Sequence, residues 1–379
     1  MKSSQYHYQN RVWQTSKSLP LASPAQLVLT FGCRQLASSK EFQSELRLAF
    51  PDADIIGCST SGEIIDTEVF DETMVVNELT FEHTETQCRS INLDDFASFD
   101  AAISSLAESL PFEHLKHVLV ISDGQNVNGT DLAEKLMTKL PTKVTISGGL
   151  AGDGDRFNET IVWHNDKVSA KQIVLCGFYG DQLQVGFGSA GGWVPFGPER
   201  LITKSEANEL YELDGQSALE LYKEYLGEFA SELPASALRF PLCLKNENNG
   251  DFTVRTILNI DESSNSLIFA GDIPEGQYVT LMRANTGKLI DGAQLSAQQS
   301  LDIAGCDDPD FALLISCVGR RLVLQQESEY ELESVQEVLG EGCTLGGFYS
   351  YGELSPRGFE NRCLLHNQTM TVTTFKEHN

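Results

Sequence analysis

The chain has 379 residues, and its 27 basic and 54 acidic side chains give a formal net charge of −27. A field of that sign repels phosphate backbones and anionic headgroups, so we expect neither nucleic acid nor a membrane surface as a partner. The start of the chain lacks the apolar core of a signal peptide, and no run reaches the roughly 18 to 20 apolar residues of a membrane span. We therefore expect a cytoplasmic protein of two domains or two halves.

The first part of the chain is predicted to alternate strands and helices. The expected order is strand 27–30, helix 40–49, strand 54–58, extended stretches 73–82 and 86–93, helix 98–110, strand 118–122, helix 130–139 and strand 143–147. Four β-like stretches then follow in succession, at 159–164, 171–179, 182–189 and 199–204. This order predicts an α/β protein with mixed β-sheets covered by helices.

A segment rich in glycine and proline, 188–198, is predicted to separate two halves, because its composition breaks helices and central strands. Beyond it, helices are expected at 206–214 and 218–227, with Gly227 as a C-cap, then strands through 240–283 and a helix at 291–304. The predicted division is an N-terminal extension (1–22), one domain over 23–197 and a second over 198–379.

Several sequence features occur twice, which indicates an internal duplication. Gly148-Gly-Leu-Ala-Gly-Asp153 is matched by 346–353, and His164-Asn165 by His366-Asn367. Upstream, the apolar runs 117–122 and 311–316 each precede an acidic, helix-like stretch (130–139 and 328–340). A duplicated fold commonly binds a ligand where its halves meet, so we expect a site at that junction.

Two glycine-rich segments are candidate binding sites. Gly57-Cys-Ser-Thr-Ser-Gly-Glu63 ends a predicted strand and offers Ser59, Thr60 and Ser61 to a small polar ligand, but Thr60-x-x-Glu63 also fits a hydrogen-bonded turn or capping box. The run 186–191 matches the dinucleotide fingerprint G-x-G-x-x-G, yet the proline-containing sequence after it cannot begin the required helix. We therefore exclude a dinucleotide at 186–191 and keep both alternatives for 57–63.

His164 and His366 are candidate metal ligands. Each has bulky apolar neighbours, and a desolvated neutral imidazole is the state that ligates a metal or haem iron. The alternative is that both are hydrogen-bonded residues of the fold.

Arg320 and Arg321 follow a predicted strand, at the end where α/β sheets bind ligands. Their guanidinium groups suit a carboxylate or a haem propionate, with Tyr351 and Glu353 completing a polar and aromatic rim. The alternative is an ion pair with nearby acids at 327, 329 or 331.

Together these motifs resemble the FIST family of intracellular sensors, which have an N-terminal and a C-terminal FIST domain. The resemblance spans nearly the whole chain. It rests on 57–64, 122–124, 148–153 and 160–163 in the first part, and on 203–205, 211–215, 218–222, 316–321, 347–353 and 366–369 in the second.

The family resemblance implies a binding module whose output lies on another protein. Standalone bacterial members of the NosP type bind haem and report nitric oxide to a histidine kinase or diguanylate cyclase. On that likeness we expect non-covalent haem b, because the chain has no Cys-x-x-Cys-His, with His366 as the tentative axial ligand and His164 as the alternative. The remaining cofactor contacts expected are Arg320, Arg321, Tyr351 and Glu353.

A FIST sensor for a small metabolite, such as an amino acid, is the alternative to haem. Its expected contacts are Ser59, Thr60, Ser61, Arg320 and Tyr351. No nucleophile with an oriented base is recognisable, so we do not expect an enzyme. The sequence leaves the oligomeric state open.

Overall fold

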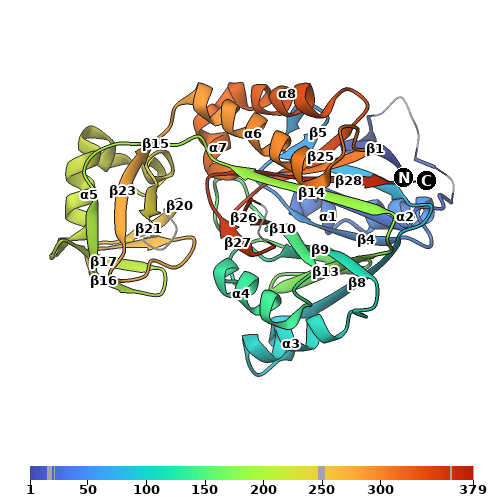
Figure 1. Ribbon diagram of the computed structural model, residues 1–379, viewed down its shortest axis with the longest axis horizontal. Coiled ribbons are helices and arrows are strands. Elements are labelled where there is room, and N and C mark those ends of the chain that lie inside the picture. Colours follow the sequence, from blue (N-terminus) through green and yellow to red (C-terminus); the bar gives the residue numbers. More distant parts are fainter. Residues whose placement is uncertain (15–18, 21, 246–251, 359–360, 379) are drawn as a thin grey trace.

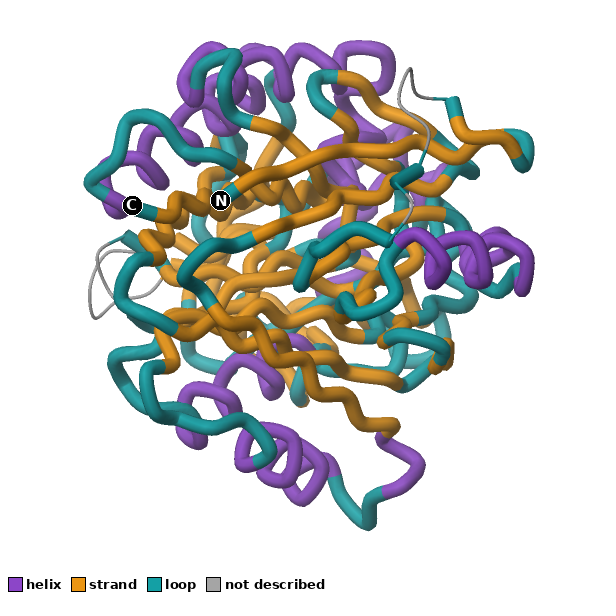
Figure 2. The backbone as a smooth tube through the Cα atoms, turned by 90° about the vertical axis from the view of Figure 1, so that its right-hand side faces the viewer, coloured by secondary structure: helices purple, strands orange, loops and turns teal. Residues whose placement is uncertain are grey.

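The computed structural model describes residues 1–14, 19–20, 22–245, 252–358 and 361–378. Its strands form three mixed sheets around one core, plus a smaller β-module (Figure 1). Helices cover the outside of the sheets and strands fill the middle (Figure 2). The predicted α/β class with mixed sheets is confirmed, and so is a two-part architecture. Within the described residues, no helix is long and apolar enough to cross a lipid bilayer.

The body is built from three consecutive units of the same design. The first comprises β1 (Lys2–Gln9), β2 (Val12–Trp13), β3 (Leu27–Gly32), α1 (Arg34–Ala37), α2 (Lys40–Ala49), β4 (Asp54–Ser59), β5 (Glu63–Ile65), β6 (Glu68–Phe70) and β7 (Met74–Thr80). The second comprises β8 (Glu85–Asn92), η1 (Leu93–Asp95), α3 (Phe99–Glu108), β9 (Leu115–Ser122), α4 (Gly129–Lys139), β10 (Thr145–Leu150), β11 (Val162–His164), β12 (Lys167–Ser169) and β13 (Gln172–Tyr179). The third comprises β14 (Leu183–Ala190), α6 (Thr286–Ala304), β24 (Phe311–Cys317), α7 (Val318–Leu324), η4 (Gln325–Glu327), α8 (Ser328–Leu339), β25 (Thr344–Ser350), β26 (Gly352–Pro356), β27 (Cys363–His366) and β28 (Met370–Glu377).

Each unit gives a short hairpin to the sheet of another unit. The core of each of the three body sheets is a parallel pair flanked by an antiparallel strand: β3–β4 with β7, β9–β10 with β13, and β24–β25 with β28. The hairpin strand β5 of the first unit then pairs with β25, β26 of the third with β10, and β11 of the second with β4. The exchange is cyclic, so no unit has a complete sheet without the others.

A glycine occupies the same place in the second parallel strand of each unit. Gly57, Gly148 and Gly347 each face a backbone carbonyl of the first parallel strand, and a Cβ there would lie 1.8–1.9 Å from its oxygen. Real Cβ atoms do not approach that closely, so only glycine fits. The sequence showed two copies of this motif, and the segment 57–63 is a third.

Alternating side chains divide the core into an inner and an outer layer. In β9, Leu119 and Ile121 point to the centre shared by the three sheets, whereas Val118 and Val120 pack against α3 and α4. The other outer layers lie beneath α2 and beneath the pair α6 and α8. Burial on both faces explains why these strands appear in the sequence as continuous apolar runs.

A separate β-module is inserted into the third unit between β14 and α6. It comprises β15 (Val194–Pro195), β16 (Arg200–Glu206), β17 (Glu209–Leu213), β18 (Gln216–Ser217), α5 (Ala218–Leu226), η2 (Gly227–Glu232), η3 (Ala235–Arg239), β19 (Leu242–Lys245), β20 (Phe252–Arg255), β21 (Ile257–Asp261), β22 (Ser266–Phe269) and β23 (Tyr278–Arg283). It has its own apolar core and lies to the left of the body in Figure 1. The helix predicted over 206–214 is wrong, because this segment forms the β16–β17 hairpin. The helix expected at 218–227 is present, and Gly227 caps it at φ 57°.

The glycines of the apparent dinucleotide fingerprint have a packing role. Gly186 and Gly188 lie in β14, and a Cβ on either would lie 2.0 or 1.9 Å from a backbone oxygen of α6. Their absence of side chains lets the helix lie directly on the strand.

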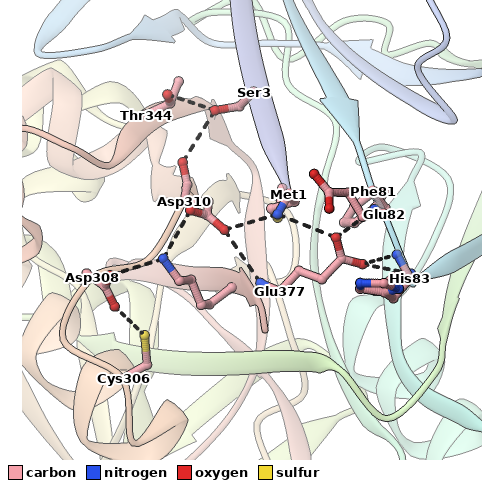
Figure 3. A network of polar contacts seen from close by, with 12 residues as sticks. Met1, Ser3, Phe81, Glu82, His83, Cys306, Asp308, Asp310, Thr344 and Glu377 are labelled. Carbon is pink, nitrogen blue, oxygen red and sulfur yellow. Dashed lines mark hydrogen bonds and ion pairs between the residues drawn. The ribbon is translucent and has the colours of Figure 1, made fainter. Parts of the chain in front are cut away.

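A polar network fastens the third unit to the chain between the first two (Figure 3). The carboxylate of Glu377 accepts hydrogen bonds from the backbone N–H groups of Glu82, His83 and Thr84 at 2.7–2.8 Å. Burial opposes ionisation of Glu377, but these donors outweigh it and lower the pKa to about 2.

Candidate functional site

The turns that end β4, β10 and β25 meet at the junction of the three units. Ser61 N–H donates to the carbonyl oxygen of Tyr349 at 2.8 Å, and Tyr349 N–H donates to Gly62 at 2.8 Å. Gly154 N–H donates to Thr60 at 3.2 Å, and the hydroxyl of Tyr351 donates to the carbonyl oxygen of Gly154 at 3.2 Å. Because each turn contacts the other two, this is where a ligand can contact all three units.

A cavity of about 620 Å³ opens at this junction. Its walls come from all three units: Cys33, Thr60, Ser61, Gly62, Glu63, Asp71 and Glu72 from the first; Gly154, Asp155 and Arg156 from the second; Val318, Arg321, Leu322, Gln325 and Gln326 from the third. This volume lies within the range of small-molecule sites. The cavity also opens beyond the ends of parallel strands, which is where α/β sheets bind ligands.

Arg321 is the cation that α7 brings into this cavity. Its Nη1 donates to the carbonyl oxygen of Ser61 and to Asp71 Oδ1, both at 2.6 Å, and its Nη2 donates to Asp71 Oδ2 at 2.6 Å. The guanidinium carbon lies 5.4 Å from the ring centre of Tyr349. The Asp71 side chain is 66% exposed, so a ligand carboxylate can replace it at low cost, since exposed ion pairs contribute little.

Opposite charges line the rest of the wall. Arg156 donates two hydrogen bonds to Asp153 Oδ1, at 3.0 and 2.8 Å, and remains half-exposed. Asp71, Glu72 and Asp155 are exposed acids in the same wall. The cavity therefore offers both guanidinium and carboxylate groups to one small ligand.

Glu63 is the buried acid of the cavity. It accepts hydrogen bonds from Thr60 Oγ1 at 2.6 Å and from the N–H and hydroxyl of Thr73 at 3.2 and 2.9 Å. Burial raises its pKa to about 7, although these hydrogen bonds oppose the rise. The segment 60–63 forms the hydrogen-bonded turn, because Gly62 N–H donates to Thr60 Oγ1 at 3.3 Å. The capping-box alternative is wrong, since no helix begins at Thr60. Thr60 and Glu63 also line the cavity.

The other residues predicted for the metabolite site lie away from the cavity wall. Ser59 is buried and its hydroxyl accepts from Ile161 N–H at 3.0 Å. Arg320 is fully buried, donating to Glu331 Oε2 at 3.0 and 2.6 Å and to the carbonyl oxygen of Leu289 at 2.8 Å. The ion-pair alternative thus describes Arg320, with Glu331 as its partner. Tyr351 stacks on Phe157, with ring centres 4.6 Å apart.

Glu353 is also buried, beyond the cavity wall. It accepts from Ser350 Oγ at 2.7 Å and from the N–H and hydroxyl of Thr369 at 3.2 and 2.9 Å. Burial raises its pKa to about 8.

The two histidines are not equivalent, which corrects the repeat expected from sequence. His164 ends β11, the first strand of an exchanged hairpin, whereas His366 ends β27, the second strand of another and opposite Glu353. His164 hydrogen-bonds through Nδ1 to Ser90 Oγ at 3.0 Å and through Nε2 to Asp54 Oδ1 at 3.2 Å. The two histidines matched in the sequence because both follow apolar residues and precede an asparagine, but the strand pairing puts them at different places in their hairpins.

His366 has one ring nitrogen fixed by the fold. Its Nε2 donates to the carbonyl oxygen of Ser355 at 3.0 Å, and burial lowers its pKa to about 4. It is therefore neutral at pH 7. Across the described parts of the chain, no group of three or more His, Cys, Asp or Glu side chains is placed to hold a metal ion.

Sequence reasoning missed Arg156 and Asp155, which the loop after β10 brings to the cavity. Their proximity to the repeated Gly152-Asp153 was the available indication. It also missed Gln325 and Gln326, because a turn between two helices has no feature that points to a ligand.

Two family models match the chain. The FIST N domain model matches residues 26–216 and the FIST C domain model matches 218–356. The chain therefore belongs to the FIST family, whose domains are signal-transduction sensor domains. The predicted boundary at 197/198 stays a prediction.

Individual relatives are distant. An uncharacterized protein of Methanocaldococcus jannaschii, MJ1623, is 24% identical over 255 residues, which cover 59% of this chain and 48% of that protein. The alignment thus spans about half the length of this curated relative. Two cyanuric acid hydrolase structures align over 78% of this chain at 10% identity; one is covered to 69%, with a TM-score of 0.24, and the other, from A. caulinodans, to 100%, with a TM-score of 0.19. TM-scores this low do not establish a common fold.

Proposed function

We propose that the protein senses a small metabolite that carries both a carboxylate and an ammonium group, an amino acid being the class, in the cavity at the junction of the three units. The observation that supports this most is the composition of the wall. Arg321 and Arg156 suit the carboxylate, and Asp71, Glu72 and Asp155 suit the ammonium. Charge-assisted hydrogen bonds of both signs discriminate such a ligand from one with a single charge.

Binding at this junction has a structural consequence. The three units that exchange hairpins all contribute to the wall. A ligand that contacts Ser61, Arg156 and Arg321 therefore links the three units and changes their relative stability or orientation. A partner responds only if it binds the occupied and empty states with different affinity. We propose that this partner is a separate histidine kinase or diguanylate cyclase.

The test is a thermal-shift screen with the protein amino acids one at a time, followed by titration calorimetry on any that raise the melting temperature. For the amino acid that binds, Arg321→Met is expected to weaken affinity about tenfold or more, because it removes a charge-assisted hydrogen bond. Asp155→Asn replaces an exposed side chain, so we expect it to leave folding intact and to weaken the affinity as well. Arg283→Met, on the exposed surface of β23, is the matched control for charge and should bind as the parent does.

Absence of binding by every amino acid would contradict the proposal. Binding that survives both Arg321→Met and Asp155→Asn would place the ligand elsewhere and contradict it too.

The haem prediction is tested separately. His366 fits an axial ligand in its neutral state, but neither it nor His164 lines the junction cavity, and His164 would have to give up one of its two hydrogen bonds. Haem held by His366 would supply an iron to which nitric oxide can bind. In a haemin titration followed by visible spectroscopy, a saturable Soret shift that His366→Ala abolishes would support haem b. A spectrum of free haemin would exclude it.

A further inference from the structure

The inserted module touches the body across a second cavity. This cavity, of about 340 Å³, lies between α4 and β27 of the body and β19, β20 and the segment 272–277 of the module. Thr130 and Glu134 lie in the wall from α4, and Arg255 and Asp272 in the wall from the module. Figure 1 shows the module joined to the body on the side where α4 and β27 lie. The cavity is separate from the junction of the three units.

Arg255 is a buried cation in this wall. Arg255 is only 8% exposed. Its guanidinium donates hydrogen bonds to two neutral acceptors, the carbonyl oxygens of Asp272 at 3.3 Å and Leu365 at 3.2 Å. Arg255 forms no ion pair with a described carboxylate, and the Asp272 carboxylate in the same wall is the acid that acts on its charge. Burial lowers its pKa to about 10, so it stays charged at neutral pH. A buried charge whose hydrogen bonds go only to neutral acceptors is unfavourable, and an anion bonded directly to the guanidinium would stabilise it.

Thr130 lies in the same wall and has an unused hydroxyl. Its Oγ1 is buried and has no hydrogen-bond partner within the described structure. A Cβ placed on Gly271 would lie 3.1 Å from Thr130 Oγ1 and 3.1 Å from Arg255 Nε, so these two groups lie close together beside that glycine. Thr130 also stands in the first turn of α4, where its N–H and that of Asp131 already donate to Asn128 Oδ1, so the hydroxyl is the group left for a ligand.

Two acids line the cavity as well. The Asp272 carboxylate is engaged by Asn128, whose Nδ2 donates to Oδ1 at 3.0 Å, and Glu134 lies one turn along α4 from Thr130. Both repel an anion, which favours a small ligand of low charge held close to Arg255.

We propose that this cavity is an oxyanion site, in which Arg255 and Thr130 bind a carboxylate or phosphate group of a small molecule. Such a ligand contacts the module through Arg255 and the body through Thr130. Its occupancy therefore changes how firmly the module is held against the body, independently of the ligand at the junction.

The experiment uses sodium phosphate and sodium acetate as probes, at constant ionic strength and pH 7, with sodium chloride as the reference. Titration calorimetry and thermal shift are expected to show saturable binding of at least one probe. A phosphate-only response identifies a phosphate ligand, and an acetate-only response identifies a carboxylate.

Thr130→Val is the main variant, because removing an unpartnered hydroxyl should leave the empty protein at least as stable as the parent. It is expected to weaken the probe about fivefold. Thr138→Val, whose hydroxyl donates to the carbonyl oxygen of Lys135 on an exposed face of the same helix, is the control. Arg255→Lys should weaken the probe further, and Arg283→Met, on the exposed surface of β23 and in the wall of neither cavity, should leave it unchanged. No binding beyond chloride, or binding equal in Thr130→Val and the parent, would overturn the proposal.

Discussion

Glu63 and Glu353 occupy equivalent positions in the first and third units. In the strand pairing, Glu63 lies opposite Phe348 and Glu353 opposite Gly149, and both of these residues directly follow the shared strand glycine. Each glutamate accepts one hydrogen bond from a hydroxyl three residues earlier, that of Thr60 or Ser350. Each accepts two more from a threonine just before the last strand of its unit, Thr73 or Thr369. In the second unit Val162 stands at this place. The second unit has a buried acid at a different place, Asp123 after β9, which accepts hydrogen bonds from Thr160 Oγ1 and Lys171 N–H.

The first prediction concerns stability between pH 4.5 and 8. The folded pKa values of Glu63 and Glu353, about 7 and 8, lie above the ordinary value of 4.5. Their contribution is therefore complete below pH 4.5 and is lost as pH rises through the folded pKa values. The loss is at most about 1.4 kcal/mol per pH unit for each group. Glu353→Gln keeps a neutral side chain at every pH, and chemical unfolding should show a flatter stability profile than the parent.

Glu341→Gln, in the exposed turn before β25, is the control for this profile. If Glu353→Gln follows the parent curve from pH 5 to 8, Glu353 is ionised in the folded state and the prediction fails.

Local structure could be predicted from the sequence to a large extent, but the assembly could not. Helix 40–49 and strand 54–58 follow from the period of apolar residues, and the observed α2 and β4 match them closely. The hairpin exchange leaves no such trace, because β5, β11 and β26 are short and pair with residues of another unit. The helix predicted at 206–214 became a hairpin because contacts within the module override local propensity.

The candidate site shows the same division. Thr60, Ser61 and Arg321 were predicted and lie in one cavity, although Ser61 and Arg321 are 260 residues apart in the chain. Arg320 precedes Arg321 directly, yet successive helical residues face different directions, and it points into the core. A pair of adjacent arginines in a sequence does not reveal which one is buried.

The second prediction concerns this buried pair. Arg320→Met leaves Glu331 buried without its cation and should destabilise the protein by about 3–5 kcal/mol. Arg320→Met combined with Glu331→Met removes both charges, and its loss in urea unfolding should be smaller than that of the single variant. If the double variant is the less stable of the two, the unpaired Glu331 carboxylate is not the cause of the loss and the prediction is wrong.

The third prediction concerns the shared strand glycine. Gly347→Ala would place a Cβ 1.8 Å from the carbonyl oxygen of Leu314, so β24 and β25 must separate. We expect a loss of about 2 kcal/mol or more, as for overpacked core sites. Gly342→Ala, which has nothing within 4 Å of its Cβ, is the control and should change the melting temperature little. Equal melting temperatures for the two variants would contradict the prediction.

The fourth prediction concerns Glu377 at low pH. Its folded pKa of about 2 lies below the ordinary 4.5, so its contribution is present above pH 4.5 and is lost as pH falls towards 2. Glu377→Gln replaces a charged acceptor of three backbone N–H groups, those of residues 82–84, by a neutral one. We expect a loss of about 1–3 kcal/mol at pH 7 that shrinks towards pH 3, because below pH 4.5 the unfolded parent chain takes up a proton on Glu377 that the folded protein does not bind. Amide hydrogen exchange should show faster exchange at 82–84 in the variant, and unchanged protection there would show that these donors do not depend on the charge.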